Sequence, residues 1–166
     1  MKDWQLAQLN IATLLAPIDS PTLADFVAAL DRINDLAEQS PGFVWRLQSD
    51  EGNATNLEHG FGDDVIANAS VWESVESLHN YVYRTAHAEI ISRRKQWFTL
   101  MRDAYTVLWW VPCGHRPTLQ EAESRLDLLR TRGPTAEAFT FKKAFPAPSD
   151  RQQTETRTFD DECPAV

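Results

Sequence analysis

The sequence predicts a single α+β domain in which an antiparallel sheet carries helices on one face. Segments rich in branched and aromatic residues alternate with segments of helical periodicity, and turn residues separate them. Their order is β-α-β-β-α-β followed by an extra helix, which is the ferredoxin-like arrangement. With 166 residues, of which 43% are hydrophobic, the chain is long enough for one such domain and its core.

The first half of the domain is predicted to contain a long strand, a helix and a short strand. Residues 4–15 have strand character, and Pro17 and Pro21 close this segment. Apolar residues then recur at steps of three and four, which predicts an amphipathic helix over 22–39. A Ser-Pro-Gly stop signal precedes a short strand over 43–48, and 49–64 is predicted to be a loop or wide hairpin connection.

The second half begins with a predicted strand over Val65–Trp72 and a helical region that runs, with a break, from residue 73 to about 102. A fourth strand is expected over 105–111. Thr118 and Glu121 form a capping-box pattern, so a last helix is expected to begin there and to end at Gly133.

Both faces of the fourth predicted strand are apolar. Leu108 and Trp110 point to one side, whereas Val107, Trp109 and Val111 point to the other. If helices cover only one face of the sheet, the other face must be covered by something else. The simplest solution is a second copy packed face to face around a two-fold axis, so the sequence predicts a homodimer.

The composition excludes several classes of partner. A net charge of −8 and a pI near 4.9 argue against binding to nucleic acid or to an anionic membrane, because both require clustered Lys and Arg. No signal peptide pattern and no apolar run of membrane-spanning length is present, so we expect a cytoplasmic protein. Residues 1–144 are predicted to form the domain, and 145–166 an extended or mobile tail.

A candidate ligand site lies in the run 71–98, where a strand meets the helix that covers it. His79, Tyr83 and His87 follow at four-residue steps, so they share one face if the helix is unbroken there. A neutral imidazole at His87 can ligate a haem iron or act as a general base. The alternative is a core histidine that is satisfied by a hydrogen bond.

Two predicted strands carry polar residues at alternating positions. The first displays Gln8 and Asn10 on one face, and the third displays Asn68, Ser70 and Trp72. If these faces point toward the helices, they bring hydrogen-bonding groups into an apolar cleft, as an orientation-selective ligand site requires. If they point outward, they are solvated edges. Asn10 is the best single candidate.

The chain has six tryptophans, which predict either core and interface packing or a stacking wall for a flat ligand. A metal site is not predicted, because Cys113 and His115 are too close for paired zinc ligands and no second pair exists. Motifs for nucleotide binding or serine hydrolysis are also lacking in the sequence.

Three segments carry a resemblance to a known family: LAQLNIA, VWESVESLHNYVYRTAHAE and LWWVPCGHRPTLQEAESRLDLLRTRGPTAEAFTF. Together they resemble the domain-of-unknown-function family 3291 of the dimeric α/β-barrel superfamily, over residues 4 to 142. The WWVP-x-GH-x-PT string is the most specific part. The resemblance implies a dimeric α/β barrel, and the superfamily includes cofactor-free antibiotic-biosynthesis monooxygenases and haem-degrading monooxygenases.

The haem-degrading members resemble this chain locally. They have a Trp-Glu-Ser at a strand end, an aromatic residue on the helix, an axial histidine further on and an asparagine in the first strand. The matching positions are Trp72-Glu73-Ser74, Tyr81, His87 and Asn10. Here the aromatic is tyrosine rather than tryptophan, and its separation from His87 is shorter.

The function predicted from these observations is binding of a flat aromatic or polycyclic metabolite between sheet and helices, by a protein that resembles the monooxygenases. A protein with this predicted function requires no cofactor. The alternatives are a haem-binding or haem-degrading protein with His87 as axial ligand, and a non-catalytic ligand-binding dimer. The predicted catalytic residues are His87, Asn10 and Trp72. The predicted ligand-binding residues are Asn68, Tyr81, Tyr83, Trp97 and Trp110.

Overall fold

The computed structural model describes residues 3–48 and 59–148 as an α+β domain. The strands are β1 (Trp4–Thr13), β2 (Phe43–Arg46), β3 (Val65–Trp72) and β4 (Thr106–Pro112). The helices are α1 (Ala24–Gln39), α2 (Val75–Arg84), α3 (His87–Arg93) and α4 (Leu119–Arg132). Short 3-10 turns over Pro21–Leu23 and Arg94–Gln96 precede α1 and follow α3.

The four strands form one antiparallel sheet in the order β2-β3-β1-β4. The ten-residue β1 lies in the centre and pairs with both β3 and β4. The predicted ferredoxin-like arrangement is therefore confirmed.

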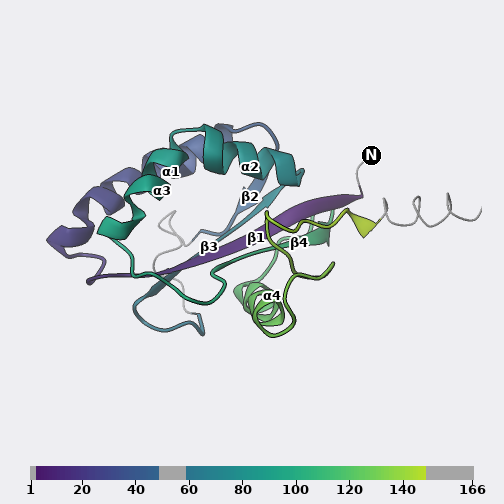
Figure 1. Ribbon diagram of the computed structural model, residues 1–166. Helices are drawn as coiled ribbons and strands as arrows, with labels where there is room; N and C mark the ends of the chain where they lie inside the picture. The colour runs from purple at the N-terminus through teal and green to yellow at the C-terminus, as the bar shows by residue number, and fades with distance from the viewer. Residues whose placement is uncertain (1–2, 49–58, 149–166) are drawn as a thin grey trace, which may run out of the picture.

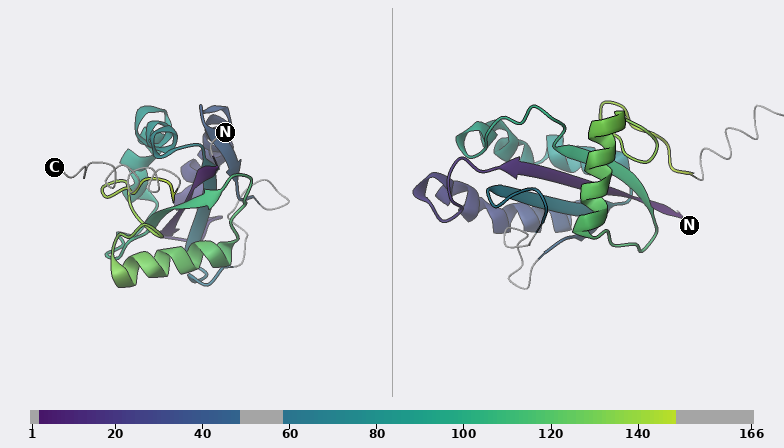
Figure 2. Two further views of the ribbon diagram at one scale, coloured as in Figure 1. Left: turned by 90° about the vertical axis from the view of Figure 1, so that its right-hand side faces the viewer. Right: turned by 90° about the horizontal axis from the view of Figure 1, so that it is seen from below.

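The helices lie on both sides of this sheet. Figure 1 shows α1, α2 and α3 on one face and α4 on the other. Figure 2 shows that α4 runs across the strands rather than along them. The two crossover helices α1 and α2 thus share a face, as the ferredoxin-like order requires, and the extra helix covers the opposite one.

The opposite face is an apolar core within this single chain. The side chains of α4 that are buried there are Ala122, Leu126 and Leu129. They pack over the apolar residues of the strands, which include Leu9, Val107 and Trp109. The expectation that this face must be covered was sound, but α4 supplies the cover, so an uncovered face no longer argues for a second copy.

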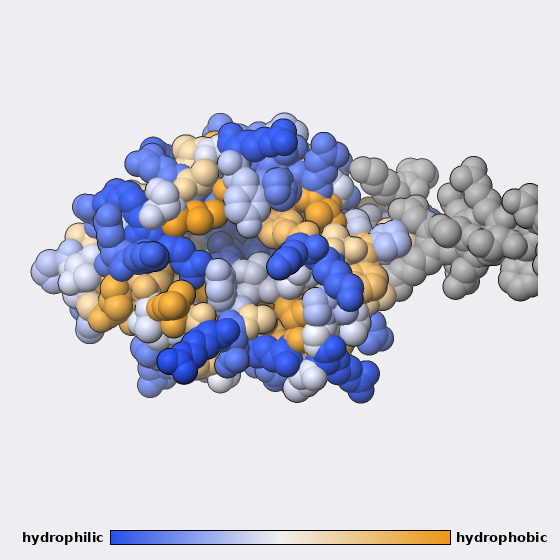
Figure 3. Space-filling view, in the orientation of Figure 1, coloured by the Kyte–Doolittle hydropathy of each residue, from blue (hydrophilic) through white to orange (hydrophobic). Residues whose placement is uncertain are grey.

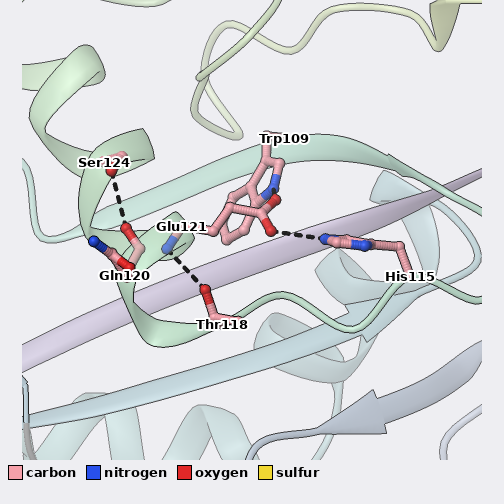
Figure 4. A network of polar contacts seen from close by, with 6 residues as sticks. All are labelled: Trp109, His115, Thr118, Gln120, Glu121 and Ser124. Carbon is pink, nitrogen blue, oxygen red and sulfur yellow. Dashed lines mark hydrogen bonds and ion pairs between the residues drawn. The ribbon is translucent and has the colours of Figure 1, made fainter.

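A small polar network fixes the first turn of α4 to the sheet (Figure 4). Thr118 is the N-cap, and its Oγ1 accepts a hydrogen bond from the backbone N–H of Glu121 at 3.1 Å. The Glu121 carboxylate accepts one bond from Trp109 Nε1 at 3.0 Å and contacts His115 Nε2 at 2.7 Å. The string WWVP-x-GH-x-PT, the most specific part of the resemblance, therefore contains the residues that hold this helix on the sheet.

The helical region after β3 is broken at Thr85. Ser74 caps α2, since its Oγ accepts from the Ser77 N–H at 3.1 Å, and α2 ends at Arg84. Thr85 is extended, with φ −116° and ψ −176°, and α3 then begins at His87. His79, Tyr83 and His87 consequently do not share one continuous helix.

The predicted tail is in contact with the domain where it begins. The carbonyl of Phe145 accepts a hydrogen bond from Trp110 Nε1 at 2.8 Å, and Ala147 is buried. The rest of this tail, from residue 149, lies outside the described residues, as does 49–58 of the predicted loop. Within the described ranges, no helix is both long and apolar enough to cross a membrane.

Candidate functional site

A row of polar side chains crosses three strands on the face that α1 to α3 cover. Gln8 pairs with Ser70 across β1 and β3, and Asn10 pairs with Asn68 on one side and Thr106 on the other. Side chains two residues apart on a strand point to the same face. Since Trp72 of this face packs against α2, the polar row points toward the helices rather than outward.

The helix layer buries Gln8 and Ser70 but leaves the Asn10 and Asn68 end of this row more open. On this side the apolar core is divided into two clusters, one around Trp72 and Leu78, the other around Phe26 and Trp97. Between them Asn10 is half-buried, and Asn68 is exposed although it lies inside a strand with a neighbour on each side. Figure 3 shows that the face in view is hollowed near its centre, with apolar side chains beside the hollow and hydrophilic ones deeper within. We call the region between the two clusters, around Asn10 and Asn68, the candidate cleft.

The two asparagines bring unused amides into the cleft. Among the described residues, neither the Asn10 nor the Asn68 side chain makes a hydrogen bond. Their positions are directly opposite on adjacent strands, where Cβ atoms lie about 5 Å apart. Each amide has two donors and an acceptor, so the pair can hold polar atoms of a bound molecule.

A hydrogen-bonded group lies beside the asparagines. Ser70 Oγ accepts from Trp72 Nε1 at 2.9 Å and from Gln8 Nε2 at 2.9 Å. Gln8 and Ser70 are both 7% exposed, which makes them the buried polar residues at the base of the cleft. Their bonds fix the indole of Trp72 in one orientation.

Aromatic rings pack together in the apolar cluster beside the polar row, where Trp72 is 1% and Tyr81 9% exposed. Trp72 stacks on Tyr81 with centroids 5.0 Å apart, and Tyr81 contacts the His87 ring at 4.7 Å. Phe43 of β2 meets the other side of Trp72 edge-on at 5.4 Å. Three predicted site residues are therefore in contact one after another, although the helix is broken at Thr85. Trp72 contacts Tyr81, and Tyr81 contacts His87.

His87 is held as a neutral side chain. Burial lowers the pKa of its imidazole, and a weaker opposing effect comes from the Val82 carbonyl, which lies 3.4 Å from Nδ1. Burial also raises the pKa of Tyr81, whose hydroxyl donates to the Ile33 carbonyl of α1 at 3.2 Å. Near neutral pH both groups are therefore uncharged, and His87 can accept a proton.

The other three predicted ligand residues lie elsewhere. Tyr83 is half exposed and contacts His79 and Phe141. Trp97 is 2% exposed in the second apolar cluster, where it packs on Phe26. Trp110 is on the cleft side of β4, but the segment that contains Phe145 covers it. None of these three shares a ring contact with Trp72 or His87 in the described part of the chain.

An ion pair between β2 and α1 borders the cleft and was not predicted. Arg46 lies opposite Ser70 on β2, and its Nε donates to Glu38 Oε1 of α1 at 2.8 Å. The Arg46 side chain is 13% exposed and its charge acts on the Tyr81 hydroxyl. A register shift in β2 between Phe43 and Trp45 decides which side Arg46 takes, and the sequence has no signal for that shift.

Two separate cavities lie outside this cleft. The larger, of about 390 Å³, is on the α4 side and is bordered by Met101, Glu123, Asp127 and Arg130. The smaller, of about 170 Å³, lies between Pro41 and α2, and Tyr81 is among its lining residues. The described residues contain no group of three His, Cys, Asp or Glu side chains that could hold a metal ion.

Comparison with known proteins identifies the family. The model of the family described as a domain of unknown function (DUF3291) matches residues 5–156, most of the chain. The chain therefore belongs to this family, and the resemblance stated from its sequence is confirmed. No curated protein matches it significantly.

Solved structures with a similar chain path include three from bacteria. SnoaB from Streptomyces nogalater, a cofactor-independent oxygenase, has 16% identity and a TM-score of 0.43, over 71% of this chain and 98% of its own. A putative antibiotic biosynthesis monooxygenase from Chloroflexus aurantiacus has 11% identity and a TM-score of 0.42, over 69% of this chain and 98% of its own. MupZ from Pseudomonas fluorescens has 16% identity and a TM-score of 0.40, over 90% of this chain and 93% of its own. At this level of identity the similarity concerns the chain path alone.

Proposed function

We propose that this protein binds a flat aromatic or polycyclic metabolite in the cleft between the sheet and α1 to α3, and oxidises it with molecular oxygen. Asn10 and Asn68 would hold polar atoms of the ligand. The Trp72 and Tyr81 rings would lie beside its apolar part, and His87 would accept a proton from it.

The single observation that carries this proposal is the open amide pair. An amide without a protein partner in a strand interior contributes little to the fold, and where it is partly buried, as at Asn10, it costs free energy. Asn10 and Asn68 occupy such positions, between two apolar clusters that would otherwise be continuous. A ligand with an apolar body and a polar edge complements that arrangement.

The cluster of aromatic rings beside the asparagines supports a flat ligand in particular. Ring pairs with centroids 4.5 to 7 Å apart gain about 0.5–1.5 kcal/mol beyond burial. Trp72 is held by Ser70, and Tyr81 by the Ile33 carbonyl, so both rings are oriented before a ligand arrives. Less conformational freedom is then lost on binding.

Binding can be tested with 1,5-dihydroxynaphthalene, a flat phenol. We expect saturable binding in equilibrium dialysis, weakened about 3- to 10-fold by Asn10→Ala or by Asn68→Ala, since each removes one neutral hydrogen-bonding group. Gln120→Ala is the control, because Gln120 carries an exposed amide on α4, on the opposite face of the sheet. Equal effects of all three variants would contradict the proposed site.

The oxidation can be tested with the same compound. Its conversion with one O₂ gives 5-hydroxy-1,4-naphthoquinone and one water. The substrate supplies all four electrons that reduce O₂, so no other reductant is needed. His87 would remove the phenolic proton and thereby raise the electron density of the ring. We expect oxygen consumption that depends on the protein and is lost in His87→Phe. Binding without oxygen consumption would instead favour a non-catalytic ligand-binding protein.

Haem binding is the second candidate function, and the orientation of His87 favours it. When Nδ1 donates to the Val82 carbonyl, Nε2 keeps its lone pair for a metal, as in histidines that ligate metals. Haem would supply iron chemistry at that nitrogen. Added haemin should then show a shifted Soret band that His87→Ala abolishes, and an unchanged spectrum would exclude this candidate.

We also propose that the protein acts as a homodimer in the cytoplasm. Because α4 covers the second sheet face, the dimer would have to use other apolar side chains, of which the most exposed are Leu15, Val27, Val44, Tyr83 and Leu100. Sedimentation equilibrium should give twice the mass of one chain. A single-chain mass at micromolar concentration would exclude the dimer.

A further inference from the structure

The Ser70 hydroxyl receives hydrogen bonds from two groups that can only donate. One is Trp72 Nε1, at 2.9 Å, since an indole nitrogen has no acceptor lone pair. The other is the side-chain amide of Gln8, at 2.9 Å. The same amide atom lies 3.4 Å from the Asn68 carbonyl, which can only accept, so that atom is the nitrogen and not the oxygen.

The Ser70 proton is consequently directed away from both partners. A hydroxyl has two acceptor lone pairs and one proton, and here both lone pairs are occupied. Within residues 3–48 and 59–148, no atom accepts a hydrogen bond from Ser70 Oγ. Arg46, its neighbour on β2, cannot accept either, because a guanidinium has only donors.

Ser70 differs in this respect from the other polar residues of the cleft. The Asn10 and Asn68 amides contain both a donor and an acceptor, so each can turn to suit a ligand atom of either kind. Ser70 cannot, because turning its proton inward would place it against the N–H of Trp72 or the NH₂ of Gln8.

We propose that Ser70 determines specificity by donating its proton to a carbonyl or phenolate oxygen of the bound molecule. This inference rests on the proposed ligand cleft and narrows its ligand class. A flat molecule with an acceptor oxygen at the ring edge is favoured. A molecule that lacks this oxygen leaves the buried proton of Ser70 unpaired.

The test compares 9-fluorenone with fluorene, two planar tricyclic compounds that differ in one carbonyl group. Equilibrium dialysis should show that the wild-type protein binds fluorenone more tightly than fluorene. Ser70→Ala should weaken fluorenone binding about 3- to 10-fold, as for loss of one neutral hydrogen bond, and change fluorene binding by less than about 2-fold. Ser124→Ala on α4 is the control and should change neither. If Ser70→Ala does not fold, Ser70→Cys keeps the shape with a weaker donor and should show a smaller loss of the same kind.

The outcomes separate the two proposals. If Ser70→Ala weakens both compounds equally, Ser70 only holds Trp72 and Gln8 in place, and the specificity inference is overturned while the proposed cleft stands. If the wild-type protein binds fluorene as tightly as fluorenone, the inference is also overturned. If neither compound binds, the proposed ligand class fails and the inference fails with it.

Discussion

Replacing Glu121 should loosen α4 from the sheet more than its surface position suggests. Its carboxylate accepts from Nε1 of Trp109, which is fully buried, so Glu121→Ala leaves that N–H without its partner (Figure 4). An unsatisfied buried donor costs about 1–3 kcal/mol. The contact with His115 joins side chains that are 25% and 43% exposed, so it adds only about 0–1 kcal/mol. The expected loss is about 1–4 kcal/mol, or about 2–16 °C in Tm for a domain of this size.

Urea unfolding, followed by circular dichroism and by tryptophan fluorescence, measures this loss. Glu121→Gln keeps an acceptor for Trp109 and removes only the charge, so it should cost less than about 1 kcal/mol. Gln120→Ala, at the exposed neighbouring position, should stay within about 0.5 kcal/mol. The reasoning fails if Glu121→Ala is as stable as the control, because water would then satisfy Trp109. It fails also if Gln and Ala variants lose the same amount.

Three further predictions concern stability. Burial lowers the pKa of His87, so below about pH 6.5 the unfolded chain binds more protons than the folded one, and stability should fall as the pH drops from there. In a plot of the urea midpoint against pH, His87→Phe should flatten that part of the curve. An unchanged curve would contradict the prediction. Leu126→Ala should cost about 2–5 kcal/mol in urea unfolding, because this fully buried residue of α4 leaves a cavity; a cost below about 1 kcal/mol would mean that α4 does not pack as described. Gly42→Ala should cost more than about 1 kcal/mol, since φ is +81° and the new Cβ would meet the Ser77 side chain; a neutral effect would show that this turn can rearrange.

The sequence predicted the fold well because local patterns define its elements. The strand over Val65–Trp72 is confirmed to the residue, and Thr118 caps the last helix as its spacing with Glu121 indicated. The side of the sheet taken by α4 was not predictable. Amphipathicity shows that a helix has an apolar face, but not which of two apolar sheet faces it covers.

The candidate site was predicted in part, for a related reason. Strand alternation placed Asn10 and Asn68 on faces of their own strands, but only the pairing of β1 with β3 sets them opposite each other. The spacing of Tyr83 and His87 suggested a shared helix face, which the extended Thr85 removes. Tyr81 contacts His87 instead, because the chain changes direction between α2 and α3.

The two faces of the β1–β3 pair support the proposal that a ligand binds at the candidate cleft. On the α4 side these strands present Leu9, Ile11, Ala67 and Ala69, which are at most 3% exposed and form continuous core. On the other side the intervening positions are Gln8, Asn10, Asn68 and Ser70. The same strands thus support an apolar core on one face and hold four polar residues on the other. Apolar residues in that row would join the two helix-side clusters and stabilise the fold by about 1.5–3 kcal/mol for each large side chain. A chain that forgoes this stabilisation in the middle of its sheet, where residues are usually selected for packing, is expected to use the site for binding.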